Sequence, residues 1–293
     1  MTRLFIFGAT GQVARCIIAK ASEAGVSSTA LSRRDVDLTD PAAVRAAIQH
    51  APNGSVVVNA AAYTAVDRAE SEPELADIIN AQAPGAMAIA CAERRLPFIH
   101  ISTDYVFDGK KSTPYVESDS TNPQGVYGRS KRDGECRVLE AHSSSLVLRT
   151  SWVYSAHANN FVKTMLRVGA EREELSVVDD QVGCPTSAVD IATAILTAAR
   201  SFSINGRQGG IYHFSGTGET SWAGFAEEIF AKSKRLGGPV ARVRRIPSKD
   251  YPVPAKRPAN SRLSSDLFAS HFECRAPAWQ ESLSVVLEEL LAA

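Results

Sequence analysis

The sequence has little that would favour binding to nucleic acid or to a membrane. Its 293 residues carry 32 Lys+Arg and 32 Asp+Glu, so the formal net charge is zero. This balance gives no electrostatic basis for non-specific binding to nucleic acid or to an acidic membrane surface. The apolar N-terminal segment 4–7 is too short for a secretory signal, and no run approaches the ~20 apolar residues of a membrane span. We therefore expect a cytoplasmic protein with no nucleic-acid or membrane partner.

Cysteine is also scarce and scattered. The five cysteines are odd in number and form no C-x-x-C pair. This pattern excludes a disulfide framework and a zinc site, and it is typical of reduced thiols. The cysteines are Cys16, Cys91, Cys136, Cys184 and Cys274. The chain also contains no internal repeat and no low-complexity tract.

What is present is an ordinary globular composition with alternating strands and helices. With 44% hydrophobic residues, the chain can form one large domain, or a domain with a smaller lobe. Its first half alternates short apolar runs with helical segments. Strands this apolar on both faces indicate an α/β fold with a doubly wound, mostly parallel, Rossmann-like sheet. The expected strands are 3–7, 28–32, 55–59, 97–102 and 145–149, and the expected helices are 12–24, 41–50, 72–94 and 127–141.

The pattern loosens after about residue 151. Glycine and proline become denser, and only three further helices are clear, at 189–199, 222–234 and 279–291. We expect residues 1–151 to form a dinucleotide-binding domain, rejoined by about 187–205. Residues 152–186 and 206–293 are expected to form a smaller α/β lobe.

A glycine-rich turn follows the first strand. Gly8-Ala-Thr10-Gly11-Gln12-Val13-Ala14 opens a helix, where glycines let the backbone approach a pyrophosphate favoured by the helix N-terminus. The spacing is G-x-x-G-x-x-A rather than G-x-G-x-x-G, and a tight turn without a ligand would leave the same pattern. Its place at the first strand of a β-α-β pattern favours dinucleotide binding.

The second strand ends in Arg33 and Arg34, with Asp37 and Leu38 just beyond. In dinucleotide-binding folds, an acidic residue at the end of the second strand hydrogen-bonds the ribose 2′-hydroxyl of NAD, whereas an arginine there accommodates the 2′-phosphate of NADP. We expect NADPH as the cofactor, with NADH possible because Asp37 is near. Two solvated arginines at a strand end remain the alternative.

Tyr127 and Lys131 are four residues apart on one expected helix and would share a face. A neighbouring ammonium favours the phenolate, so Lys131 is expected to lower the pKa of Tyr127. Such a phenol suits a general acid. Upstream, the strand ending at Thr103 supplies hydroxyls for a carbonyl oxygen. An isolated Tyr-x3-Lys often occurs by chance, and the surrounding motifs decide in its favour.

With these motifs together, the chain resembles the extended short-chain dehydrogenase/reductase superfamily and, within it, the dTDP-4-dehydrorhamnose reductases. The resemblance runs nearly end to end. The motifs that carry it are Gly8-Ala-Thr-Gly-Gln-Val, Asn59-Ala-Ala-Ala-Tyr-Thr-Ala-Val-Asp67, Ser102-Thr-Asp-Tyr-Val-Phe-Asp-Gly109, Tyr127-Gly-Arg-Ser-Lys-Arg-Asp-Gly-Glu135, Arg149-Thr-Ser-Trp-Val-Tyr154, Asn160-Phe161, Asp180-Gln-Val-Gly-Cys-Pro-Thr186 and Arg257-Pro-Ala-Asn-Ser-Arg-Leu263.

The resemblance implies a role for each matching position. Thr103, Tyr127 and Lys131 would be catalytic, with the tyrosine as proton donor and the lysine holding the cofactor. The dinucleotide would be contacted by the two catalytic residues Tyr127 and Lys131 and by Gly8, Thr10, Gly11, Gln12, Val13, Arg33, Asp37, Leu38, Ala60, Ala61, Ala62 and Tyr63. The substrate would be contacted by Asp104, Tyr105, Trp152, Asn160 and Arg257. For Trp152, core packing remains an equal alternative. For Arg257 a contact with the substrate diphosphate is favoured, because its surroundings are proline-rich and loop-like, although a surface salt bridge would leave the same pattern.

The sequence departs from some members of this family at one point. Those members hold magnesium through glutamates at a dimer interface, and the matching positions here are Cys16 and Val189. Neither is a ligand that magnesium prefers. We therefore expect no metal site, and a monomer or weak homodimer.

The implied reaction is hydride transfer to the C4 keto carbon of a dTDP-linked 6-deoxy-4-keto sugar. Two alternatives remain open. One is a reductase for another nucleotide-linked 4-keto sugar, because the sequence does not show which carbonyl face meets the nicotinamide. The other is a non-catalytic NADP-binding subunit similar to the regulatory subunit of methionine adenosyltransferase.

Overall fold

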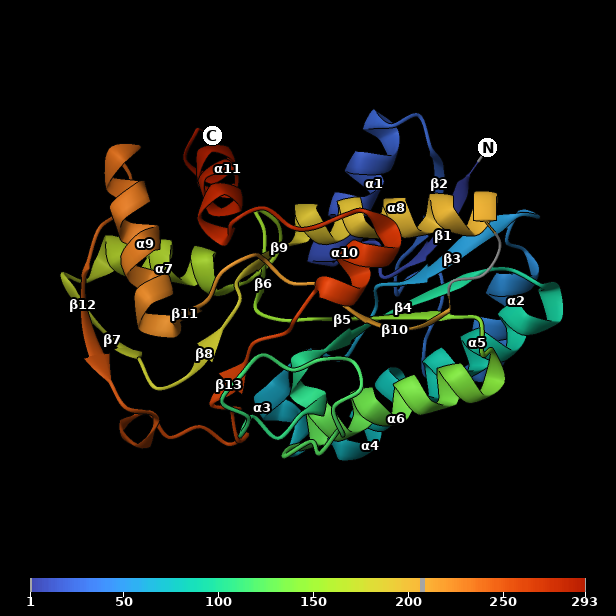
Figure 1. The fold of residues 1–293 in the computed structure, drawn as a ribbon, viewed down its shortest axis with the longest axis horizontal. Helices are drawn as coiled ribbons and strands as arrows, with labels where there is room; N and C mark the ends of the chain where they lie inside the picture. Colours follow the sequence, from blue (N-terminus) through green and yellow to red (C-terminus); the bar gives the residue numbers. More distant parts are fainter. Residues whose placement is uncertain (1, 206–208, 293) are drawn as a thin grey trace.

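A six-stranded parallel sheet forms the centre of the larger part of the molecule (Figure 1). The computed structural model describes residues 2–205 and 209–292. The strand order is β10-β5-β4-β3-β1-β2, and every pairing is parallel. The fold expected from the sequence is confirmed. The strands are β1 Arg3–Phe7, β2 Ser27–Leu31, β3 Ser55–Asn59, β4 Phe98–Thr103, β5 Leu146–Thr150 and β10 Gly210–His213.

Helices cover both faces of this sheet (Figure 1). Alternate residues of β1 point to opposite faces, so Leu4 and Ile6 join one core cluster while Phe5 and Phe7 join another. Burial on both faces explains why these strands are continuously apolar. The helices are α1 Gln12–Glu23 and α8 Ala188–Asn205 on one face, and α2 Pro41–Gln49, α5 Ala83–Arg94 and α6 Val126–Ala141 on the other.

The long helix expected at 72–94 is interrupted. It consists of α4 Pro73–Asp77, a π-helical turn η1 Ile78–Gln82, and α5. Pro84 has no N–H, so it cannot complete the α-helical hydrogen bond to the carbonyl of Asn80. The local shift to π geometry follows from this gap and leaves that carbonyl outside the helical pattern.

By length and composition alone, the helix Pro73–Arg94 could cross a membrane. The expectation that no segment approaches that length is therefore wrong on those two measures. In the structure, 61% of its most apolar window is buried, and its C-terminal part packs against α2 and α6.

A smaller lobe lies beside the sheet, with its own apolar core (Figure 1). Phe225 and Ile229 of α9 and Leu283 of α11 are fully buried there. Its helices are α7 Phe161–Glu171, α9 Trp222–Arg235 and α11 Trp279–Leu291. Its short strands are β6 Val153–Tyr154, β7 Glu174–Val178, β8 Val182–Gly183, β9 Thr186–Ser187, β11 Thr220–Ser221, β12 Arg242–Ile246 and β13 Asn260–Ser261. The remaining elements of the molecule are α3 Val66–Ala69, η2 Asp104–Val106, η3 Ser248–Asp250 and α10 Asp266–Phe272.

The chain returns to the large sheet twice after residue 151. Helix α8 packs against α1 of the large sheet. Strand β10 also pairs with β5, and α10 packs on β10 and α8. Assigning 206–293 entirely to the lobe was therefore wrong for this stretch, because a four-residue strand that begins with glycine gives almost no pattern. The expected boundary at residue 206 lies outside the described residues.

Candidate active site

The glycine turn lies where the strand order of the large sheet reverses, between β1 and β3. Gly8 has φ +95°, and a Cβ there would lie 2.8 Å from the backbone nitrogen of Ala61. Only glycine fits this close approach. Helix α1 begins after Gly11 with no side-chain cap on its first N–H groups. These free donors beside an open turn fit a pyrophosphate, so the residues present suit a dinucleotide.

The segment after β2 presents several charged groups to solvent. Arg33 and Arg34 are both exposed. The carboxylate of Asp37 instead accepts hydrogen bonds from the nitrogen and hydroxyl of Thr39, and these hold its pKa below the usual value. Because Asp37 is engaged within its own turn, Arg33 is the better placed of the two to meet a 2′-phosphate.

Gln12 and Asn160 meet, although they were expected on different ligands. The Asn160 amide nitrogen donates to Gln12 Oε1 at 3.0 Å, and Asn160 Oδ1 caps α7 by accepting from the nitrogen of Lys163. Ser155 also donates to Gln12 Oε1 at 2.9 Å. The two side chains therefore join the lobe to the glycine turn.

Two of the expected catalytic side chains, Thr103 and Tyr127, meet at the carboxyl end of β4. Thr103 ends that strand, and its hydroxyl donates to Asp104 Oδ1 at 3.0 Å. The ring of Tyr127, at the start of α6, meets the ring of Tyr105 edge-to-face at 5.5 Å. A hydrogen bond also couples Tyr127 to Thr103. Hydroxyl groups from a strand and a helix thus lie side by side at this strand end.

The phenol of Tyr127 is not acidified in this arrangement. Burial raises its pKa well above 10, Asp104 and Tyr105 raise it further, and only the hydrogen bond with Thr103 lowers it. The expectation that Lys131 lowers this pKa is therefore wrong here, because the lysine amine is directed elsewhere. A phenol that stays protonated at neutral pH still has a proton to donate.

Lys131 is 2% exposed. Its Nζ donates to the carbonyl oxygen of Ile101 at 2.7 Å and lies 3.4 Å from Nε2 of His100. Burial lowers the pKa of Lys131 to about 8, and the nearby charge of Glu135 acts in the opposite direction. This lysine can therefore lose its proton close to neutral pH.

Asp104 is the buried acid of the site. It is 3% exposed, and burial raises its pKa to about 6, against hydrogen bonds from Ser261 and Thr103. A carboxyl group held partly neutral near a reacting oxygen is common at functional sites. Its position beside Thr103 is compatible with the expected substrate contact.

Asn80 connects the cofactor side to the catalytic helix. Its Oδ1 accepts from the nitrogen of Tyr63, while its Nδ2 donates to the Tyr63 carbonyl and to the Ser130 hydroxyl. This amide is fully buried and fully used. Gly128 lets α6 approach closely, since a Cβ there would lie 2.2 Å from the carbonyl oxygen of Tyr105.

Trp152 and Arg257, both expected to contact the substrate, have partners within the protein. Arg257 donates to Asp67 at 2.6 Å and to the Tyr105 hydroxyl at 3.2 Å. Trp152, with φ +48°, stacks on Trp222 at 3.6 Å between ring centroids. Both alternatives that the sequence left open, a salt bridge for Arg257 and packing for Trp152, are present. Arg257 nevertheless reaches the site through Tyr105.

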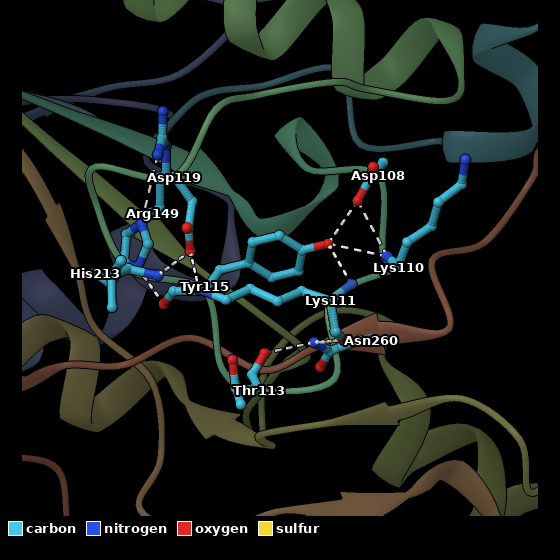
Figure 2. A network of polar contacts seen from close by, with 10 residues as sticks. Asp108, Lys110, Lys111, Thr113, Tyr115, Asp119, Arg149, His213 and Asn260 are labelled. Carbon is cyan, nitrogen blue, oxygen red and sulfur yellow. Dashed lines mark hydrogen bonds and ion pairs between the residues drawn. The ribbon is translucent and has the colours of Figure 1, made fainter.

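A polar network anchors the loop between η2 and α6 (Figure 2). The Tyr115 hydroxyl donates to Asp108 Oδ1 at 2.7 Å and accepts from the nitrogens of Lys110 and Lys111. Asn260 of the lobe donates to the carbonyls of Lys111 and Thr113. The loop is therefore held between the reactive strand end and the lobe.

Behind this loop lies a buried ion pair that the sequence did not reveal. Arg149 of β5 and Glu135 of α6 are each 2% exposed, and they form two hydrogen bonds of 2.9 and 2.6 Å. Arg149 also contacts His213 of β10 at 3.4 Å (Figure 2). Its guanidinium lies over the ring of Phe107, 5.0 Å from the centroid. Glu135 and Arg149 stand within the quoted motifs, but only the fold brings them together.

The remaining expectation concerns metals. Within residues 2–205 and 209–292, no group of three or more His, Cys, Asp or Glu side chains is arranged to hold a metal ion. Cys16 is buried, and this burial raises the pKa of its thiol to about 11. The lack of a magnesium-linked dimer stays a prediction.

Residues 1–292 match the family described as RmlD substrate binding domain. The chain belongs to this family. It is 46% identical over 291 residues to dTDP-4-dehydrorhamnose reductase from Sinorhizobium fredii, covering 99% of this chain and 98% of that protein. A relative of the same name from Mycobacterium tuberculosis is 40% identical, covering 97% of this chain and 92% of that protein.

Solved structures agree with this assignment. The dTDP-4-dehydrorhamnose reductase from Bacillus anthracis, in complex with NADP, superposes with a TM-score of 0.91 at 34% identity, covering 98% of this chain and 99% of that one. A UDP-glucose 4-epimerase superposes with a TM-score of 0.82 at 15% identity, covering 99% of this chain and 96% of that one. The second likeness concerns the fold alone.

Proposed function

We propose that this protein reduces the C4 keto group of dTDP-4-dehydro-L-rhamnose to give dTDP-L-rhamnose, with NADPH as the hydride source. The observation that carries the proposal is the convergence of Thr103, Tyr127 and Lys131 at the carboxyl end of β4. Membership of a family whose relatives bear the name dTDP-4-dehydrorhamnose reductase supports the substrate. The product belongs to nucleotide-sugar synthesis for cell-surface polysaccharide.

The residues of the glycine turn and of the ends of β2 and β3 would hold the cofactor. Bound NADPH supplies a hydride from its nicotinamide ring, and the protein supplies orientation and proton transfer. NADPH is proposed over NADH because Arg33 is exposed while Asp37 is engaged by Thr39. The NADP complex of the Bacillus anthracis relative supports the same choice.

At the carbonyl, charge develops on the oxygen as the C4 carbon accepts a hydride. Tyr127 donates its phenolic proton to that oxygen, and Thr103 donates a hydrogen bond to it. Lys131, which lies one helical turn from Tyr127, would contact the ribose hydroxyls beside the nicotinamide ring. Preorganised donors around one reacting atom supply most of the rate enhancement in such sites.

Substrate contacts would come from both parts of the molecule. Asp104 and Tyr105 lie beside Tyr127, and Arg257 reaches them from the lobe through the Tyr105 hydroxyl. As a planar guanidinium, Arg257 suits a diphosphate, once it exchanges Asp67 for the ligand. We propose that the protein acts in the cytoplasm as a monomer or weak homodimer.

The test is to follow nicotinamide absorbance with dTDP-4-dehydro-L-rhamnose generated in situ. We expect substrate-dependent oxidation of NADPH, slower oxidation of NADH, and little reaction with the GDP-linked 4-keto sugar. Equal rates with the GDP-linked sugar would reassign the substrate. No oxidation above the substrate-free control would reject the reductase itself.

A further inference from the structure

His100 lies directly behind the amine of Lys131, and its protonation is fixed by a third residue. Asn59 is fully buried at the end of β3, and its Oδ1 accepts from the nitrogen of Ala61 at 3.1 Å. This bond orients the amide, so that Nδ2 faces Nδ1 of His100 at 3.1 Å. An amide nitrogen can only donate, and Nδ1 of His100 must therefore accept.

The imidazole of His100 is consequently neutral, with its proton on Nε2. A charged ring would place an N–H donor on Nδ1 against the donor of Asn59. His100 is fully buried, and both burial and the nearby charge of Lys131 lower its pKa well below 6.5. Geometry and electrostatics thus agree on one tautomer.

The Nε2 proton is directed at the amine of Lys131, 3.4 Å away. Nζ already donates to the carbonyl of Ile101 at 2.7 Å. An ammonium has no lone pair to accept a hydrogen bond, whereas a neutral amine has one. The contact is therefore unfavourable for the ammonium and favourable for the amine.

We propose that His100 is a positioning residue for Lys131: Asn59 fixes it as the Nε2–H tautomer, and its N–H donates to Nζ of Lys131 only when that lysine is neutral. The inference rests on the proposed function, because Lys131 is a reactive group only in that reading of the site. His100 itself touches neither substrate nor cofactor. It acts through the lysine.

Other charged groups also influence the pKa of Lys131. Glu135, one helical turn further along α6, raises the pKa of Lys131, while its carboxylate is bound by Arg149. Burial and the His100 N–H act in the other direction. His100 of β4 and Glu135 of α6 act on Lys131 directly. Arg149 of β5 acts through Glu135, and Asp104 and Tyr105 of η2 act on Tyr127, one turn before Lys131 on α6.

The chain from Ala61 through Asn59 and His100 to Lys131 also links two parts of the site. Ala61 belongs to the loop after β3 that would face the dinucleotide. A shift of that backbone changes the hydrogen bond which orients Asn59. The loop is therefore coupled to the protonation of Lys131 through two buried side chains.

The direct test is nuclear magnetic resonance of the full-length protein without substrate or cofactor, labelled with 15N in histidine and 13C in lysine. We expect the His100 ring to stay neutral from about pH 5 to 9 with a protonated Nε2 and a bare Nδ1. We also expect Lys131 to titrate well below the ordinary lysine range of about 10.4. A proton on Nδ1 instead of Nε2 would overturn the proposal.

Two variants separate the effect of His100 from burial. In His100→Phe, the N–H is lost while the site stays enclosed, so the pKa of Lys131 rises by about one unit, a tenfold change in the ammonium-to-amine ratio. In Asn59→Asp, the carboxylate accepts a hydrogen bond from a protonated Nδ1 and leaves a bare Nε2 to accept from the ammonium. The same rise is expected, with the ring tautomer reversed.

An unchanged or lower pKa of Lys131 in His100→Phe would contradict the proposal, because burial alone would then set it. Reductase assays of the same variants add an independent measurement. The pH dependence of kcat/KM should shift in the direction of the Lys131 titration, with little change in KM for the sugar nucleotide. Since the resonance measurements need no turnover, they stand or fail separately from the proposed reaction.

Discussion

Arg149 and Lys131 are cations with the same 2% exposure but different partners. Arg149 is matched by the carboxylate of Glu135, which forms two hydrogen bonds to it. Among residues 2–205 and 209–292, no carboxylate contacts Lys131, whose Nζ meets the carbonyl of Ile101 and the ring of His100. A cation with a buried counter-ion is a structural cross-link, whereas one facing neutral dipoles is prone to lose its proton. Arg149 therefore stays charged in its ion pair, whereas Lys131 can change its protonation state.

The largest effect is expected from breaking the matched pair. Arg149→Met leaves the Glu135 carboxylate buried without its cation, so the free energy of unfolding in urea should fall by about 3–5 kcal/mol. The double variant Arg149→Met/Glu135→Leu removes both charges and should recover most of that loss. If the single variant lost less than about 1 kcal/mol, the ion pair would contribute no more to stability than an exposed surface pair does.

Lys131 should reveal itself through the pH dependence of stability. Its pKa is about 8 when folded and 10.5 for an ordinary lysine, so the unfolded chain binds this proton more tightly. The resulting destabilisation is complete below pH 8 and is relieved as the pH rises toward 10.5. Relative to Lys131→Met, the wild type should gain about 3 kcal/mol across this window.

This gain is measured by urea unfolding of both proteins at several pH values. The comparison with Lys131→Met cancels the cysteine and tyrosine titrations that the two proteins share. A difference that stays flat between pH 8 and 10.5 would show that Lys131 keeps an ordinary pKa.

Gly128→Ala tests whether the close approach of α6 to the backbone of Tyr105 is needed to position Lys131. A Cβ at this position meets the Tyr105 carbonyl at 2.2 Å, so the first turn of the helix must move. We expect a loss of about 1–3 kcal/mol in unfolding free energy, accompanied by reduced kcat. Arg129→Ala, at the next and exposed position of α6, is the control and should change stability by no more than about 0.5 kcal/mol.

Phe107→Leu tests the cation–π contact between Arg149 and the ring of Phe107. The guanidinium of Arg149 lies 5.0 Å from the ring centroid of Phe107, and the substitution removes the ring's attraction for it. Phe98→Leu is the matched control, since Phe98 is also fully buried but belongs to a different core cluster. The Phe107 variant should lose about 1 kcal/mol more than the control in urea unfolding. Equal losses of unfolding free energy in the two variants would show that Phe107 contributes only apolar packing and no attraction for Arg149.

The parts of this comparison differ in how far the sequence could predict them. The strands β1, β3, β4 and β5 are predictable because burial on both faces leaves continuous apolar runs. Strand β10 is not, since Gly210 and His213 interrupt any such pattern. The π-helical turn at Asn80 follows from Pro84, but a proline inside a helix signals only a local irregularity and not its form.

The site shows the same division. Spacing alone placed Tyr127 and Lys131 on one helix face, and the motif placed Thr103 at the end of a strand. The pKa of Tyr127 was predicted in the wrong direction, because burial and the direction of the Lys131 amine depend on packing between α6 and β4. The partners of Lys131 and Arg149 are set by contacts across the sheet, which no local pattern encodes.

The most direct test of the account is Tyr127→Phe, which removes one hydroxyl and keeps the ring that packs on Tyr105. NADPH affinity should stay close to that of the wild type. The rate of dTDP-4-dehydro-L-rhamnose reduction should fall by a factor of about 10²–10⁴, the usual contribution of a general acid. Turnover near the wild-type rate would contradict the assignment of Tyr127 as proton donor, and with it the proposed mechanism.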